Sequence, residues 1–135
     1  MITEDYVSVE TAKLLKEKGF DEITFTWYNG KGKFCVGKNN FDDYHMNHFS
    51  SMAITAKDKN KCSAPTLQTA MKWIRKKHNL YIDPYPEDNN TWCLIIWELY
   101  PKCVKQCKGK YDDLSYLTPE EACEAAIRYC LENLI

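Results

Sequence analysis

The sequence lacks the features that mark several classes of protein. Its formal net charge is only −1, so the chain as a whole is not a polyelectrolyte that binds nucleic acid through excess charge. No apolar run approaches the roughly 20 residues of a membrane-spanning helix. The N-terminus, MITEDYVSVE, is acidic, whereas a secretory signal needs positive charge followed by an apolar run. We therefore expect a cytoplasmic protein without a membrane partner.

Glycine is scarce, and the cysteines follow no pattern. The five glycines form no glycine-rich loop of the kind that cradles a phosphate group. The seven cysteines are odd in number and lack a repeating spacing, which argues against a disulfide framework and favours a reducing cytosol. Most thiols are then small buried apolar groups. No cofactor is indicated.

What the chain does contain is one strongly apolar stretch, TWCLIIWELY, at residues 91–100. Because side chains alternate along a strand, one face would hold Trp92, Leu94 and Ile96. The other face would hold Cys93, Ile95, Trp97 and Leu99. A strand that is apolar on both faces belongs in the middle of a sheet. Helices should cover one face, and either the segment 37–61 or another molecule should cover the other.

Three amphipathic segments predict helices, at 8–18, at 63–78 and from Thr118 onward. The last of these begins with TPEE, a capping box with threonine at the cap and glutamate three residues later. Strands are predicted at 22–28 and 33–36, joined by an Asn-Gly turn, and at 80–83 and 91–100. Residues 102–116 predict a loop or a weak edge strand.

These elements predict the fold class. The 135 residues fit one domain, 1–135. We expect an α+β fold in which an antiparallel sheet of about four strands carries three helices mostly on one face. The order along the chain would be α-ββ-α-ββ-α.

Two short motifs raise the question of a metal site. HMNH contains His45 and His48, and CVKQC contains Cys103 and Cys107. Four such ligands could hold zinc, but no second cysteine pair follows, so we predict no metal ligand. We also predict no catalytic residue. An alternative is a small enzyme whose site lies in the 37–61 segment and joins a histidine to a thiol or a carboxylate.

Four basic residues form the strongest charged cluster, namely Lys72, Arg75, Lys76 and Lys77. They could bind nucleic acid by neutralising phosphates. The near-zero net charge and the lack of a groove-reading motif favour the solvated face of a helix, whose C-terminus attracts positive charge. A nucleic-acid-associated protein is therefore an alternative reading of the sequence.

Aromatic residues make up 13% of the chain, which leaves large rings available for a binding surface. If nothing within the chain covers the second face of the central strand, that face is an interface. The candidate interface residues are Trp92, Leu94, Ile96 and Trp97. The partner would be another protein or a second copy of the chain in a homodimer.

Three segments carry a resemblance: YVSVETAKLLKEKGF, SAPTLQTAMKWIRKKHNLYI and YLTPEEACEAAIRYCLENLI. The chain resembles a group of short proteins of unknown function that are encoded by phages, prophages and other mobile elements of gut anaerobic bacteria. The likeness excludes residues 29–62. It implies a small accessory protein in a bacterial cytoplasm. We therefore expect a non-enzymatic accessory or protein-interaction module.

Overall fold

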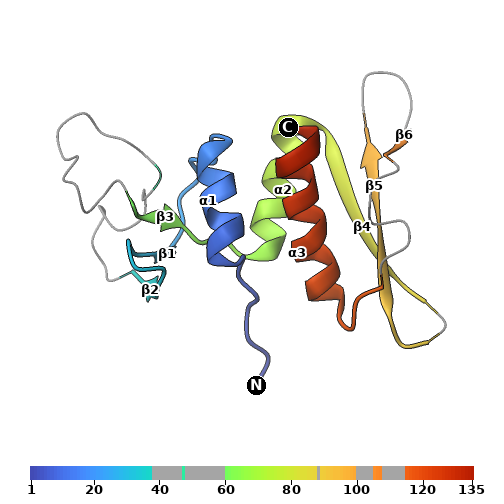
Figure 1. Ribbon diagram of the computed structural model, residues 1–135, viewed down its shortest axis with the longest axis horizontal. Coiled ribbons are helices and arrows are strands. Elements are labelled where there is room, and N and C mark those ends of the chain that lie inside the picture. Colours follow the sequence, from blue (N-terminus) through green and yellow to red (C-terminus); the bar gives the residue numbers. More distant parts are fainter. Residues whose placement is uncertain (38–46, 48–59, 88, 100–104, 108–114) are drawn as a thin grey trace. The chain divides into compact units, whose positions relative to one another are not determined.

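In the computed structural model, the chain folds into two compact units (Figure 1). The N-terminal unit contains Tyr6–Thr66, and the C-terminal unit contains Met1–Asp5 with Leu67–Ile135. The prediction of a single domain over 1–135 stays a prediction. The residues that the structure describes are 1–37, 47, 60–87, 89–99, 105–107 and 115–135.

In the N-terminal unit, helix α1 (Val9–Glu17) lies where the sequence predicts a helix. The Ser8 hydroxyl accepts a hydrogen bond from the Thr11 N–H at 3.2 Å, which satisfies an amide that has no partner inside the helix. After the helix, Gly19 adopts a φ of +92°. This left-handed conformation favours glycine and ends the helix.

Three short strands complete the N-terminal unit. Strands β1 (Thr26–Tyr28) and β2 (Phe34–Val36) form the predicted antiparallel hairpin, and β3 (Cys62–Ser63) pairs with the other edge of β1. Asn29 stabilises the turn because its side-chain oxygen accepts hydrogen bonds from the N–H groups of Lys31 and Lys33. β1 is shorter than the predicted 22–28, since its partner strands supply only a few residues for pairing.

The residues that lead into β1, together with its first residue, bury threonine side chains and expose apolar ones. Thr24 and Thr26 are each 6% exposed, whereas Ile23 and Phe25 are 52% and 63% exposed. The buried hydroxyls are satisfied: Thr26 Oγ1 donates to the Ala64 carbonyl at 2.6 Å, and Thr24 Oγ1 donates to the Thr26 carbonyl at 2.9 Å. Hydrogen bonding therefore offsets the cost of burying these two hydroxyls.

The C-terminal unit contains two longer helices, α2 (Leu67–His78) and α3 (Pro119–Tyr129). Asn79, with a φ of 57°, ends α2 in the left-handed conformation that asparagine tolerates. The Thr118 hydroxyl caps α3 by accepting from the Glu121 N–H at 3.1 Å, as the TPEE motif predicts. α3 continues as a π-helical turn, η3 (Cys130–Leu134).

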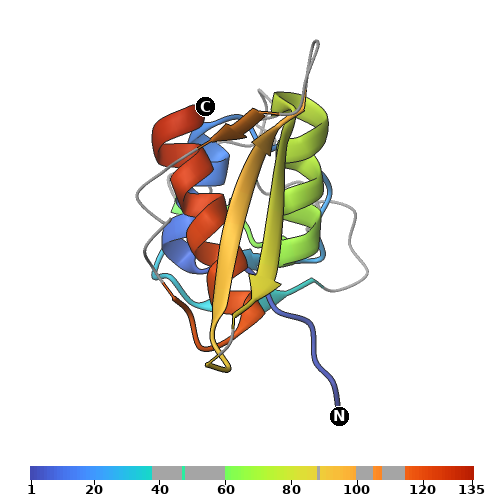
Figure 2. The same cartoon turned by 90° about the vertical axis from the view of Figure 1, so that its right-hand side faces the viewer.

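The sheet of this unit has the order β4-β5-β6, with β4 at Leu80–Pro86, β5 at Trp92–Glu98 and β6 at Lys105–Cys107. All pairing is antiparallel. β5 lies in the centre, as its apolar character predicts. β6 matches one of the two alternatives predicted for 102–116, a weak edge strand. Figures 1 and 2 show α2 and α3 side by side against one face of β4 and β5.

β4 is longer than the predicted 80–83, since the strand continues through Pro84 and ends at Pro86. The Glu87 N–H bonds the Thr91 carbonyl, and the Leu99 N–H bonds the Asn79 carbonyl. Odd-numbered residues of β4 therefore make the hydrogen-bonded pairs with β5. Pro84 and Pro86 occupy the alternate positions, whose amide nitrogens point to the free edge. A proline there removes no hydrogen bond from the sheet.

The predicted α+β class and α-ββ-α-ββ-α order are confirmed, with β3 and β6 as short additional strands. The structure differs from the expected single sheet of about four strands in one respect. The strands form two sheets of three, one in each unit. The reason is the pairing of β1, whose two edges are taken by β2 and β3, so that no edge of it is left for β4 or β5.

Candidate functional site

The sheet β4-β5-β6 has one face that packs against helices. Leu80 and Ile82 of β4 are each 5% exposed, and Leu94 and Ile96 of β5 are 5% and 2% exposed. The register places Ile82 opposite Ile96 and Pro84 opposite Leu94, so these residues share one face. α2 and α3 cover this face and form the core of the C-terminal unit with it.

The other face of the same strands carries Tyr81, Asp83, Tyr85, Cys93, Ile95 and Trp97, and we call it the open face. Figure 2 looks onto it, and no described helix of the C-terminal unit lies in front of the strands. Tyr81 and Tyr85 are 41% and 37% exposed. Asp83, Ile95 and Trp97 are half-buried, and Cys93 is buried at 2% exposed. Large rings on a face without helices are a candidate binding surface.

The register fixes the arrangement of the open face. Tyr81 lies directly opposite Trp97, and Asp83 lies opposite Ile95. The Trp97 indole N–H donates to Asp83 Oδ2 at 3.4 Å, across the diagonal between the two strands. This contact orients both the indole ring and the carboxylate. The site is therefore built on strands whose backbone positions are set by the ladder and not by a loop.

At one end of this sheet, Glu87 gathers several polar neighbours. Glu87 Oε2 accepts from Ser115 Oγ at 3.3 Å and from Thr91 Oγ1 at 3.5 Å. Burial raises the pKa of the Cys93 thiol, and the hydrogen bond and charge of Glu87 raise it further. A thiol held protonated in this way is a poor nucleophile.

Two other buried thiols are equally unsuited to catalysis. Burial raises the pKa of Cys62, although the nearby Lys16 opposes this shift. Burial and the neighbouring Glu120 raise the pKa of Cys123 to about 11. All three cysteines act as buried apolar groups, as the sequence predicts for most of its thiols.

The predicted interface residues do not all share a face. Trp92, Leu94 and Ile96 lie on the helix-covered side of β5, and Trp97 alone belongs to the open face. Alternation along the strand allowed either face of β5 to point outward. The helices cover the face with Leu94 and Ile96, so the face with Trp97 is the outward one. Sequence reasoning missed Tyr81, Asp83 and Tyr85, although the alternation in LYIDPY gives a signal for them.

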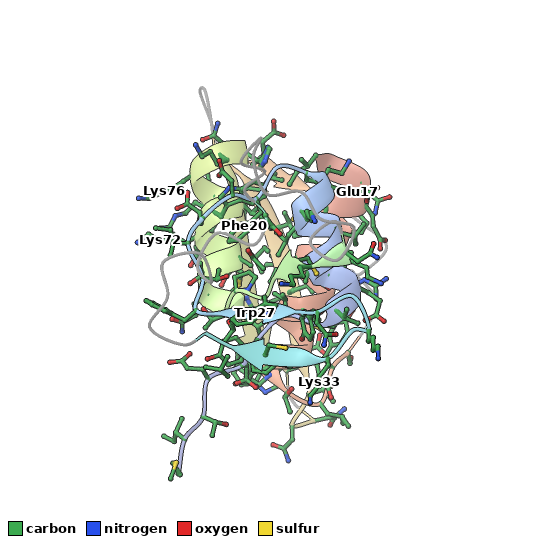
Figure 3. All side chains as sticks on the ribbon, turned by 90° about the vertical axis from the view of Figure 1, so that its left-hand side faces the viewer. Glu17, Phe20, Trp27, Lys33, Lys72 and Lys76 are labelled. Carbon is green, nitrogen blue, oxygen red and sulfur yellow. The ribbon has the colours of Figure 1, made fainter. Side chains whose placement is uncertain are left out.

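The predicted basic patch lies on α2. Lys72, Arg75, Lys76 and Lys77 are all exposed. Figure 3 shows Lys72 and Lys76 extending away from the helix. They lie four residues apart and therefore share one side of α2. The lysines at 102, 108 and 110, which could extend this patch, lie outside the described residues.

The histidines and the cysteine pair considered as metal ligands are not tested by the structure. His45, His48 and Cys103 lie outside the described residues, as does most of the 37–61 segment proposed for an enzyme site. Among the residues that are described, no group of three or more His, Cys, Asp or Glu side chains is placed to hold a metal ion.

No protein-family model matches the chain, and no curated protein or solved structure matches it. Within the described part of the chain, none of the helices has the length and apolar character needed to cross a bilayer.

Proposed function

We propose that the protein is a small non-enzymatic interaction module that binds another protein, or a second copy of itself, through the open face. The observation that carries the proposal is the set of large rings, Tyr81, Tyr85 and Trp97, on a sheet face without described helices. Aromatic side chains are enriched where proteins bind each other. The resemblance to accessory proteins of phages and mobile elements agrees with such a role.

The free edge of β4 is poorly suited to pair with a strand of a partner protein. This favours a partner that binds the open face. At the free edge of β4, Pro84 and Pro86 present no N–H to an incoming strand. Partners that extend a sheet depend on main-chain hydrogen bonds along the whole edge. A partner would therefore contact the side chains of the open face.

Site-specific photo-crosslinking tests this proposal. A photoreactive phenylalanine analogue placed at Tyr81 should cross-link to a protein in cells that naturally produce the chain. The same analogue at Arg128, a partly exposed position on α3, is the matched control. Sedimentation of the purified chain at high concentration would identify the self-associating version. Absence of any cross-link above the control, together with a strict monomer, would overturn the proposal.

A second candidate function is nucleic-acid binding, which the exposure of Lys72, Arg75, Lys76 and Lys77 favours. Binding through these side chains would neutralise phosphates and fall steeply with salt. A fluorescent single-stranded and a double-stranded oligonucleotide should then bind at low salt and weaken when Lys72 and Lys76 become serine. The matched control replaces Lys31 and Lys33, which lie in the β1–β2 turn. Failure to bind at low salt would exclude this candidate.

A further inference from the structure

The open face is acidic as well as aromatic. Asp83 lies in the middle of the β4 row, and Glu87 follows at the end of the same alternating row. Of the described side chains on this face, none is basic. The whole chain is nearly neutral, so the negative charge is a local property of the surface. A partner that matches it must bring positive charge.

Tyr81 and Tyr85 flank the Asp83 carboxylate on the same face of β4. Tyr81 and Tyr85 are each two residues from Asp83 on the same face, about 7 Å away along the strand. A cation is attracted to the face of an aromatic ring when it lies within about 6 Å of the ring centre. A cation that bonds Asp83 therefore comes within reach of a neighbouring ring.

Asp83 is already oriented for such a contact. Trp97 Nε1 donates to Oδ2 of Asp83 at 3.4 Å, which restricts rotation of the carboxylate. Hydrogen bonds between a carboxylate and a guanidinium or ammonium group are stronger than neutral ones. The planar guanidinium of arginine also stacks on aromatic rings, so this surface suits arginine better than lysine.

The same features disfavour the other occupants. A second copy docked with the two-fold axis through the middle of the open face would bring Asp83 close to its own equivalent. Seven-residue strands in a three-stranded sheet also offer a footprint on the order of 300 Å², below the roughly 800 Å² per partner of a stable interface. Nucleic acid would bring phosphates toward two carboxylates. A short segment with few contacts fits better.

We propose that the open face binds a cationic peptide segment of another protein, with an arginine side chain held by Asp83 and stacked on Tyr81 or Tyr85. This inference rests on the proposed function and names the chemistry of its partner. Ile95, between Trp97 and Cys93 on β5, would contact the apolar stem of the arginine.

Fluorescence anisotropy with labelled synthetic peptides tests the inference on the full chain. The probes are a peptide of alternating glycine and arginine, and matched peptides in which lysine, glutamine or glutamate replaces arginine. We expect the arginine peptide to bind most tightly, the lysine peptide more weakly, and the other two not measurably. Asp83→Asn should weaken arginine-peptide binding about tenfold, and Tyr81→Leu several-fold.

Two control variants separate this site from general attraction to acidic surface. Glu98→Gln removes a carboxylate from the same sheet at a position that alternates away from the open face. Glu120→Gln removes one from the acidic first turn of α3. Both should change binding less than twofold. Amide chemical-shift mapping adds a second readout: shifts should concentrate at 81–85 and 95–97, and circular dichroism checks that each variant is folded.

The outcomes distinguish the inference from the function on which it rests. Equal binding of the arginine and glutamine peptides, or equal losses in Asp83→Asn and Glu98→Gln, would overturn the inference. A cross-link from position 81 under those conditions would leave the interaction module standing with a partner of different chemistry. Concentration-dependent dimerisation lost in Asp83→Asn or Tyr81→Leu would assign the open face to a second copy and would also overturn the cationic partner.

Discussion

Single side chains determine several backbone positions in this protein, and Asn47 shows this most directly. It is 8% exposed. Its Nδ2 donates to the Phe20 carbonyl at 2.8 Å, and its Oδ1 accepts from the Ser63 N–H at 2.9 Å. One amide group thus joins the segment after α1 to β3. No periodicity in the surrounding polar sequence predicts this role.

Replacing Asn47 with alanine should destabilise the protein by about 2–3 kcal/mol, because a buried N–H and a buried carbonyl would lose their partners. Urea denaturation followed by circular dichroism measures the change. Asn133→Ala, on the exposed surface of η3, is the matched control and should change stability by less than about 0.5 kcal/mol. Equal stabilities of the two variants would contradict the role given to Asn47.

The raised pKa of the Cys123 thiol predicts that the stability of the folded protein falls with rising pH in the alkaline range. Its pKa is raised from 9.0 to about 11 in the folded state by burial and by Glu120. The unfolded thiol ionises first, so the contribution to stability is complete below pH 9 and is lost as the pH rises from about 9 to about 11. Cys123→Ala should flatten this loss relative to Cys35→Ala, as measured by denaturation at a series of pH values. An unchanged slope would argue against the shift.

At the scale of elements, local sequence patterns correctly predict where helices begin and which strand is central. They do not predict which face of a strand is covered. The cap at Thr118 is confirmed because a cap depends only on residues within one helical turn. The central position of β5 also follows from its composition. Which face of β5 the helices cover is decided by long-range packing, so Trp97 and Leu94 could not be separated from sequence alone.

The prolines of β4 give a prediction about its edge. Replacing Pro84 and Pro86 with valine restores two N–H donors at the free edge of the sheet. We expect little change in folded stability but a marked rise in concentration-dependent association, measured by sedimentation and light scattering. Pro119→Ala, in the first turn of α3, leaves this edge untouched and should stay unassociated. If both variants associated to the same degree, the prolines at the β4 edge would not be what prevents association.

At the scale of the whole molecule, the chain passes between its two units at Asp5–Tyr6 and at Thr66–Leu67. The sequence predicts one domain, whose unfolding should be a single cooperative transition. The division of the strands into two sheets was not predicted, because strand propensity does not specify which strands pair. Most residues of the 37–61 segment lie outside the described residues, so its predicted roles stay predictions.

Hydrogen exchange tests whether the chain unfolds as one domain. If it does, Asn47→Ala in the N-terminal unit should speed exchange equally in α1 and in the buried turns of α2 and α3. The measurement is native-state exchange by mass spectrometry, with Asn133→Ala as the reference. Faster exchange confined to 6–66 would show that the two units unfold separately and that the single-domain prediction is wrong.

The inverted burial at residues 23–26 has a consequence for how the pairing register of β1 is specified. Because Ile23 and Phe25 are exposed, apolar burial in this segment does little to favour the native pairing over one shifted by a residue. Two polar contacts hold the native register instead: Thr26 Oγ1 donates to the Ala64 carbonyl, and the Tyr28 hydroxyl donates to the Val7 carbonyl. A register that depends on hydrogen bonds more than on apolar burial is only weakly specified against slippage.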